Sequence, residues 1–166
     1  MRVIFKFFFF TIFACADAQT KQDTIKYFQQ QSQVYLTKMY ISKQFDTASS
    51  MWDKRMYLEM QDFYNKRKQG HFTDTILHAR IKGDIEKYYK RLSKFKIGKF
   101  LGSMLEADAV YIIGQTYYSY VETINGKQTK ATLMLVFISE DKGKTWVIQD
   151  WKIKDIADKV DRKIIK

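Results

Sequence analysis

The 166-residue sequence predicts an α+β domain in which helices come first and an antiparallel sheet follows. Apolar residues recur at helical spacing in the first part of the chain, and after Ser93 their period changes to two. Asn125-Gly126 then stands between two β-rich runs, and this dipeptide favours a tight hairpin turn. The chain contains no proline, so no predicted element is interrupted by one.

Residues 22–43 are predicted to form the first helix, because apolar side chains recur on one face of that segment. These side chains are Ile25, Phe28, Tyr35 and Met39, widened by Leu36 and Tyr40. A break follows, and Asp46 is expected to cap a second helix over 46–54 through its carboxylate. Residues 56–65 either extend that helix or form a third short one.

A longer helix is predicted over 75–93, with Thr73 or Asp74 as its N-cap. Its apolar positions recur at helical spacing: Leu77, Ile81, Ile85, Tyr88 and Leu92. We expect this helix to lie across the sheet, with Lys82 and Lys90 facing solvent, because the apolar stripe and the sheet must bury each other.

The sheet is predicted to begin near Phe95 and to run toward Leu101. Two long strands follow, over 108–123 and 128–139, and a last strand lies within 145–153. In the tail, over 155–165, three apolar residues at helical spacing predict a short terminal helix: Ile156, Val160 and Ile164.

The first eighteen residues predict a signal peptide, leaving 19–166 as a single domain. Arg2 and Lys6 precede a short apolar run, and Ala16 and Ala18 form a small-residue cleavage site. The expected product is therefore exported, periplasmic or secreted, and begins at Gln19. A lipoprotein anchored at Cys15 is the alternative.

The expected mature chain is strongly basic and contains no cysteine. The full chain carries a formal charge of +11, and residues 1–18 hold two basic side chains and one acidic one, which leaves +10. This charge favours anionic partners such as an envelope surface, a polysaccharide or nucleic acid. No run of five like charges occurs in the sequence, and nucleic acid is not the partner that we expect. Lysines scattered singly are also what an ordinary solvated surface contains. Without cysteine, packing alone must hold the fold.

Three segments resemble the nuclear-transport-factor-2-like superfamily: KQFDTASSMW, LSKFKIGKFL and SEDKGKTWVIQDW. The resemblance spans roughly residues 25–153 and is to small exported bacterial members. It implies a cystatin-like cone, in which a curved sheet wraps a long helix and a cavity lies between them. The superfamily includes isomerases, hydrolases, dehydratases and proteins without known activity, so the fold does not select a function.

Asp150 is the weak candidate for a catalytic residue. It lies two positions after Ile148 and four after Trp146, so a regular strand would point all three to one face. On a concave, aromatic face the pKa of this carboxyl would rise; on the outer face it would be solvated. His71 and His78 have no carboxylate at a readable spacing, and neither a metal cluster nor a cofactor motif is present.

Four aromatic residues are the predicted lining of a ligand cavity: Tyr88, Tyr118, Tyr120 and Trp146. Ordinary core packing is the alternative interpretation of the same residues. The leading hypothesis is an exported, non-catalytic domain that binds a small apolar or amphipathic ligand, or a partner protein, through its cone. The alternatives are an isomerase or lyase using a cavity carboxylate or tyrosine, and a basic protein attached to an anionic envelope. A homodimer is compatible with each.

Overall fold

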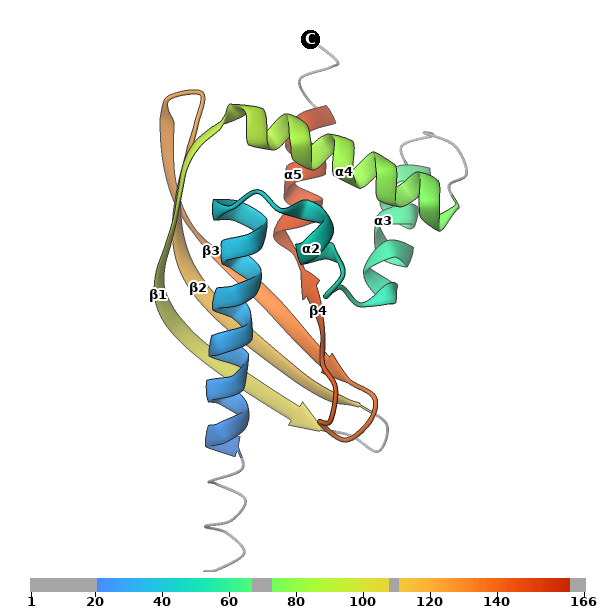
Figure 1. Ribbon diagram of the computed structural model, residues 1–166, viewed down its shortest axis with the longest axis vertical. Helices are drawn as coiled ribbons and strands as arrows, with labels where there is room; N and C mark the ends of the chain where they lie inside the picture. Colours follow the sequence, from blue (N-terminus) through green and yellow to red (C-terminus); the bar gives the residue numbers. More distant parts are fainter. Residues whose placement is uncertain (1–20, 67–72, 108–110, 162–166) are drawn as a thin grey trace, which may run out of the picture.

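The computed structural model describes residues 21–66, 73–107 and 111–161 and has the predicted α+β class. The helical segments come first, and a four-stranded antiparallel sheet follows in the order β1-β2-β3-β4 (Figure 1). The sheet curves and does not close on itself. The predicted signal peptide, its cleavage site and Cys15 lie outside the described residues.

The first helix covers residues 21–36 and continues as a π-helical turn, η1 (Thr37–Ile41), close to the predicted 22–43. It lies along the concave side of the sheet, which we call the inner face. Phe28 stacks on Phe137 of the sheet with ring centroids 4.6 Å apart. The contact requires Gly114 beneath it, since an added Cβ there would lie 2.1 Å from the Phe28 ring.

The next two helices are separate: α2 (Phe45–Ser49) has five residues and α3 (Lys54–Lys66) has 13. The segment 56–65 therefore belongs to a helix of its own. The predicted cap by Asp46 is wrong: Gln44 occupies the N-cap without a side-chain bond. Asp46 lies in the first turn and accepts instead from the Lys82 ammonium at 2.7 Å.

Helix α4 (Asp74–Arg91) begins after Thr73, whose hydroxyl accepts from the Ile76 amide at 3.4 Å as a side-chain cap. All five residues of the predicted apolar stripe are buried. The expectation that this helix lies across the sheet is met only at one end, where the Tyr88 hydroxyl donates to Glu122 of the sheet at 2.7 Å. Most of the inner face is covered by the helix over 21–41 instead. Helix α4 crosses one end of the sheet and packs on α5 (Lys152–Asp161) (Figure 1). Lys90 is exposed as expected, and the Lys82 side chain is 37 % exposed, with its ammonium paired to the exposed Asp46.

Three long strands form most of the sheet, β1 (Leu92–Ala107), β2 (Ile112–Ile124) and β3 (Lys127–Ser139). The predicted Asn125-Gly126 turn is confirmed, and both residues have positive φ, +50° and +79°. Register shifts in β1 help the sheet to bend around the first helix.

The last strand is short, β4 (Val147–Asp150), and its free edge is covered. Trp52 forms a parallel bridge with Ile148, so the chain just before α3 extends the sheet. The tail is helical as expected but begins earlier, at Lys152, and Ile156 within it is buried. Residues 162–166 lie outside the described part.

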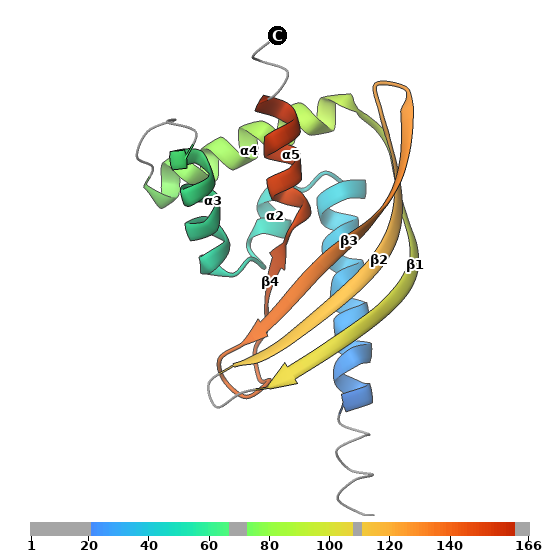
Figure 2. The ribbon, with the colours of Figure 1, turned by 180° about the vertical axis from the view of Figure 1, so that it is seen from behind.

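The helices group on the inner side of the sheet, and the opposite side, the outer face, has none across it (Figure 2). Side chains of β2 alternate accordingly, with buried positions on the inner face. Within 21–66, 73–107 and 111–161, no helix combines the length and apolar character that crossing a bilayer requires.

Candidate functional site

Seven polar or charged side chains gather where the inner face meets α4 and α5, and we call them the buried polar centre. They come from the first helix, α4, β2, β4 and α5: Tyr35, Tyr40, Tyr88, Tyr120, Glu122, Asp150 and Lys152. None of them is more than 5 % exposed. Burying two carboxyl groups and an ammonium together is expensive unless each has partners, so their contacts decide whether the centre is structural or reactive.

Asp150 ends β4 on the inner face and shares that face with buried Ile148. The two-residue period predicted the shared face but left open which of the two faces it is. Its Oδ2 accepts from the hydroxyls of Tyr35, at 2.9 Å, and Tyr40, at 2.5 Å. Its Oδ1 accepts from the backbone amide of Lys152 at 2.9 Å. Burial raises the pKa of Asp150, and the hydrogen bonds from Tyr40 and Tyr35 oppose that rise.

The π-helical turn explains why two tyrosines of one helix reach the same carboxylate. In an α-helix, residues five apart point in different directions, since neighbours on one face are three or four apart. In η1 the hydrogen bonds are wider, and the Ser42 amide donates to the Thr37 carbonyl at 2.8 Å. The wider turn brings Tyr40 to the side of the helix where Tyr35 lies.

Lys152 occupies the other half of the centre. Its ammonium donates to Glu122 at 2.8 Å and to the Tyr120 hydroxyl at 2.9 Å. The Tyr88 hydroxyl donates to the same Glu122 oxygen at 2.7 Å. The ammonium also lies 4.4 Å from the centroid of the Tyr120 ring and 5.5 Å from that of Tyr88, within the range of cation–π attraction.

The tyrosines of the centre act as hydrogen-bond donors. Burial raises the pKa values of Tyr35, Tyr40 and Tyr88, and the neighbouring carboxylates raise them further. Their hydroxyls therefore stay protonated, and the Tyr35 oxygen in turn accepts from the Trp52 indole at 2.9 Å. The hydrogen bonds form two clusters, one around Asp150 and one around Glu122, and Lys152 belongs to both through its backbone amide and its ammonium.

The structure brings together three of the five predicted site residues, Tyr88, Tyr120 and Asp150. Tyr118 also lies on the inner face, but 4 % exposed against the first helix, where its hydroxyl donates to the Gln29 carbonyl at 3.5 Å. Trp146 is half-buried against Phe28, 4.7 Å between centroids, and donates to the Gly143 carbonyl at 3.1 Å. Neither of the two cavities described below is lined by more than one of these five residues.

Two cavities border residues of interest. One, beside Asp150 and Met60, has a volume of about 20 Å³, enough for a single water molecule. The other is an open groove of about 380 Å³ near Arg55, outside the inner face. There the guanidinium is already paired with Asp53, at 2.6 Å, and with Glu140, at 3.1 Å.

Four residues of the buried polar centre were missed as site residues at the level of the sequence: Tyr35, Tyr40, Glu122 and Lys152. For Glu122 alone, the sequence does contain a signal. This residue alternates with Tyr118 and Tyr120 along β2, so it had to share their inner face. The match between Glu122 and Lys152 spans 30 positions and could not be read from spacing.

His78 has two polar neighbours in the fold that its position in the sequence did not indicate. No three His, Cys, Asp or Glu side chains within them come together to hold a metal ion. His78 lies half-buried between Tyr57, 2.8 Å from its hydroxyl, and Asp46, at 3.8 Å. His71 falls outside the described residues.

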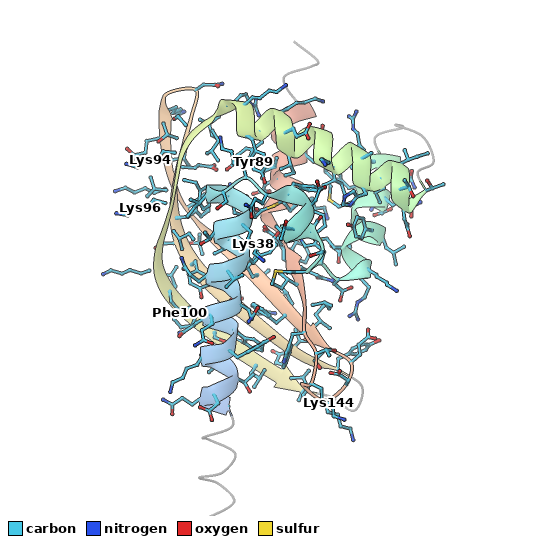
Figure 3. All side chains as sticks on the ribbon, in the orientation of Figure 1. Lys38, Tyr89, Lys94, Lys96, Phe100 and Lys144 are labelled. Carbon is cyan, nitrogen blue, oxygen red and sulfur yellow. The ribbon has the colours of Figure 1, made fainter. Side chains whose placement is uncertain are left out.

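The outer face carries a second feature, four exposed lysines that we call the outer basic patch: Lys94, Lys96, Lys99 and Lys130. Lys96 and Lys130 flank Val121 from the two neighbouring strands, which places them about 10 Å apart across the sheet. None of the four forms an ion pair with a described residue. Figure 3 shows Lys94 and Lys96 pointing away from the helices.

Comparison with known proteins yields no match to a family, to a curated protein or to a solved structure. The resemblance to the nuclear-transport-factor-2-like superfamily therefore remains a prediction from the sequence.

Proposed function

We propose that this is an exported, non-catalytic protein that attaches to a polyanionic surface through the outer face of its sheet. The observation that carries the proposal is the outer basic patch, whose lysines are exposed and without an acidic partner among the described residues. Like charges held together on one face repel each other, and an anionic partner relieves that repulsion.

The filled inner face favours binding of a partner on the outer surface over binding of a ligand inside the fold. A cone-like fold with an internal ligand, as the resemblance implies, needs empty volume beside the candidate residues. Here the first helix covers the inner face, and the buried polar centre satisfies its own charges. A ligand entering the centre would have to displace Lys152 from Glu122.

The isomerase or lyase alternative has less support. Asp150 does have a raised pKa and two tyrosine neighbours, which are features of acid–base sites. The cavity beside it, however, has room for one water molecule and no substrate. Turnover of a hydrophobic carbonyl compound that disappears in Asp150→Asn at unchanged thermal stability would overturn the non-catalytic proposal.

Retention on immobilised dextran sulfate tests the attachment. The patch variant Lys94→Gln/Lys96→Gln/Lys130→Gln should elute at clearly lower salt than the wild type, because exposed charges bind through screened attraction. The control Lys21→Gln/Lys54→Gln/Lys144→Gln removes the same charge from exposed positions elsewhere.

The control variant should elute close to the wild type. Figure 3 shows Lys144 at the far end of the molecule from Lys94 and Lys96. Lysines on an edge strand also prevent pairing with foreign strands, and if that is their whole role the two triple variants will elute together. That result would refute the proposal.

Export is tested separately. Expression in a secreting bacterial host should give an envelope-fraction product that begins at Gln19, as the Ala16–Ala18 cleavage site predicts. A product with an intact Met1 in the cytosol would contradict export. A lipid-labelled product beginning at Cys15 would support the lipoprotein alternative instead.

A further inference from the structure

The outer basic patch continues along β1 into exposed apolar residues. Leu101 is 55 % exposed and Met104 is 52 % exposed, and both follow Lys99 on the same edge strand. Met104 pairs with Gln115, a position of β2 that faces outward, so its side chain shares the outer face with Lys96.

The lysines and the apolar residues form one elongated surface. Lys96 pairs with Val121 and Met104 with Gln115, six positions apart on β2, so the two side chains lie about 20 Å apart along the sheet at the usual rise per residue. No helix crosses this side of the sheet (Figure 2). A partner that covers this surface must therefore bind positive charge at one end and exposed apolar side chains at the other.

We infer that the polyanionic surface is a lipid bilayer with anionic headgroups, with Leu101 and Met104 entering its interface. The inference rests on the proposed attachment function and names its target. Headgroup phosphates match the lysines, and the acyl boundary beneath them takes up apolar side chains, the combination that interfacial proteins use.

Nucleic acid fits this surface less well. Proteins that bind it without sequence preference stack exposed aromatic rings on bases and make many contacts through arginine. The outer basic patch contains lysine alone, and the nearest outward ring, Tyr117, is half-buried with its hydroxyl bonded to Gln115 at 2.5 Å. Leu101 and Met104 would stay exposed on such a partner.

Co-sedimentation with vesicles of phosphatidylcholine containing about one third phosphatidylglycerol tests the inference. All variants contain the same residues 1–20, so any contribution of that segment to vesicle binding is the same in each and does not affect the comparison. Leu101→Gln/Met104→Gln should bind the vesicles at least about tenfold more weakly than the wild type, because the apolar contacts are lost. Its retention on dextran sulfate should not change.

Leu58→Gln/Ile76→Gln provides the matched control. These residues are 60 % and 53 % exposed on α3 and α4, away from the outer face, so their replacement should leave vesicle binding unchanged. The affinity of the lysine variant Lys94→Gln/Lys96→Gln/Lys130→Gln for the same vesicles should fall about fivefold per lysine. On vesicles of pure phosphatidylcholine, the wild type and the lysine variant should bind equally.

The outcomes separate the inference from the function on which it rests. If the apolar variant binds vesicles as the wild type does, or if single-stranded RNA is bound more tightly than vesicles, the bilayer inference fails while dextran sulfate retention still supports attachment. If the lysine variant changes neither binding, both fail. Insertion itself predicts that Leu101→Trp gains fluorescence quenched by brominated acyl chains, beyond any quenching of the wild type.

Discussion

The two faces of the sheet handle the same kind of side chain in opposite ways. On the inner side, Lys152 is 5 % exposed and is held by Glu122, Tyr120 and the surrounding rings. On the outer side, Lys96 is exposed and has no described acidic partner. A buried charge must be paired to be tolerated, whereas an exposed one is stabilised by water and stays available. The comparison therefore distinguishes a lysine that stabilises the interior from a lysine that is available to bind a partner.

Breaking the inner ion pair should have the largest effect. Glu122→Ala leaves the Lys152 ammonium buried without its carboxylate, and the free energy of unfolding should fall by about 3–5 kcal/mol. Urea denaturation measures it. The outer control, Lys96→Ala, should stay within about 0.5 kcal/mol of the wild type. The double variant Glu122→Leu/Lys152→Met should recover much of the loss, and equal losses for Glu122→Ala and Lys96→Ala would remove the distinction between the faces.

The next largest effect concerns packing on the inner face. Gly114→Ala places a methyl group 2.1 Å from the Phe28 ring, and overpacking of this kind should cost about 1–3 kcal/mol. A thermal unfolding series with Gly114→Ala, Phe28→Leu and the double variant measures the coupling. The double variant should be more stable than the two single losses predict, because the smaller side chain gives way. Additive losses would mean that the close approach is not limiting.

Asp150 should make stability depend on acid pH. Burial raises its pKa in the folded state, so the folded chain binds the proton more readily than the unfolded one. Relative to Asp150→Asn, the wild type should gain stability as pH falls through the folded pKa. The gain should level off below the unfolded value near 3.8. Urea denaturation of both proteins in the same buffers across this pH range measures the difference in their free energies of unfolding. If the wild type instead becomes less stable than Asp150→Asn as the pH falls, the hydrogen bonds lower the pKa of Asp150 by more than burial raises it.

The smallest stability change belongs to the outer face. Lys94→Gln/Lys96→Gln/Lys130→Gln should leave the free energy of unfolding within about 0.5 kcal/mol per substitution, or raise it slightly at low salt, because it removes like-charge repulsion. Raising the salt should erase any gain, since screening already weakens the repulsion. A loss well beyond that range would indicate that these lysines support the fold.

The local elements of this fold were predictable because they depend on near neighbours. The apolar spacing from Leu77 to Leu92 located α4 closely, and Asn125-Gly126 located the hairpin. The predictions that failed required a choice between partners that the sequence does not distinguish. Asp46 is a suitable cap by type, but the Lys82 ammonium lies within its reach once the chain is folded. Nothing in either stripe showed which helix would cover the sheet.

The buried polar centre was only partly predictable. The period of two assigned Asp150 to the face of Ile148, and both are buried there. Tyr88 and Tyr120 were selected as aromatic lining, and they instead hold Glu122 and Lys152 through their hydroxyls and rings. Long-range pairing of this kind has no signature in spacing, because it depends on how α5 returns to β2.

The π-helical turn η1 also determines where the length of the chain can change. A residue five positions after Tyr35 lies beside it only because this turn is wider than an α-helical one. Removing one residue from the turn before Met39 would place Tyr40 four positions after Tyr35, which is the neighbouring position of an ordinary α-helix. Both hydroxyls would still face Asp150, with the helix regular throughout. We therefore expect η1 to accommodate a one-residue deletion of a kind that would disrupt most helices, so that this fold could form from chains of two different lengths.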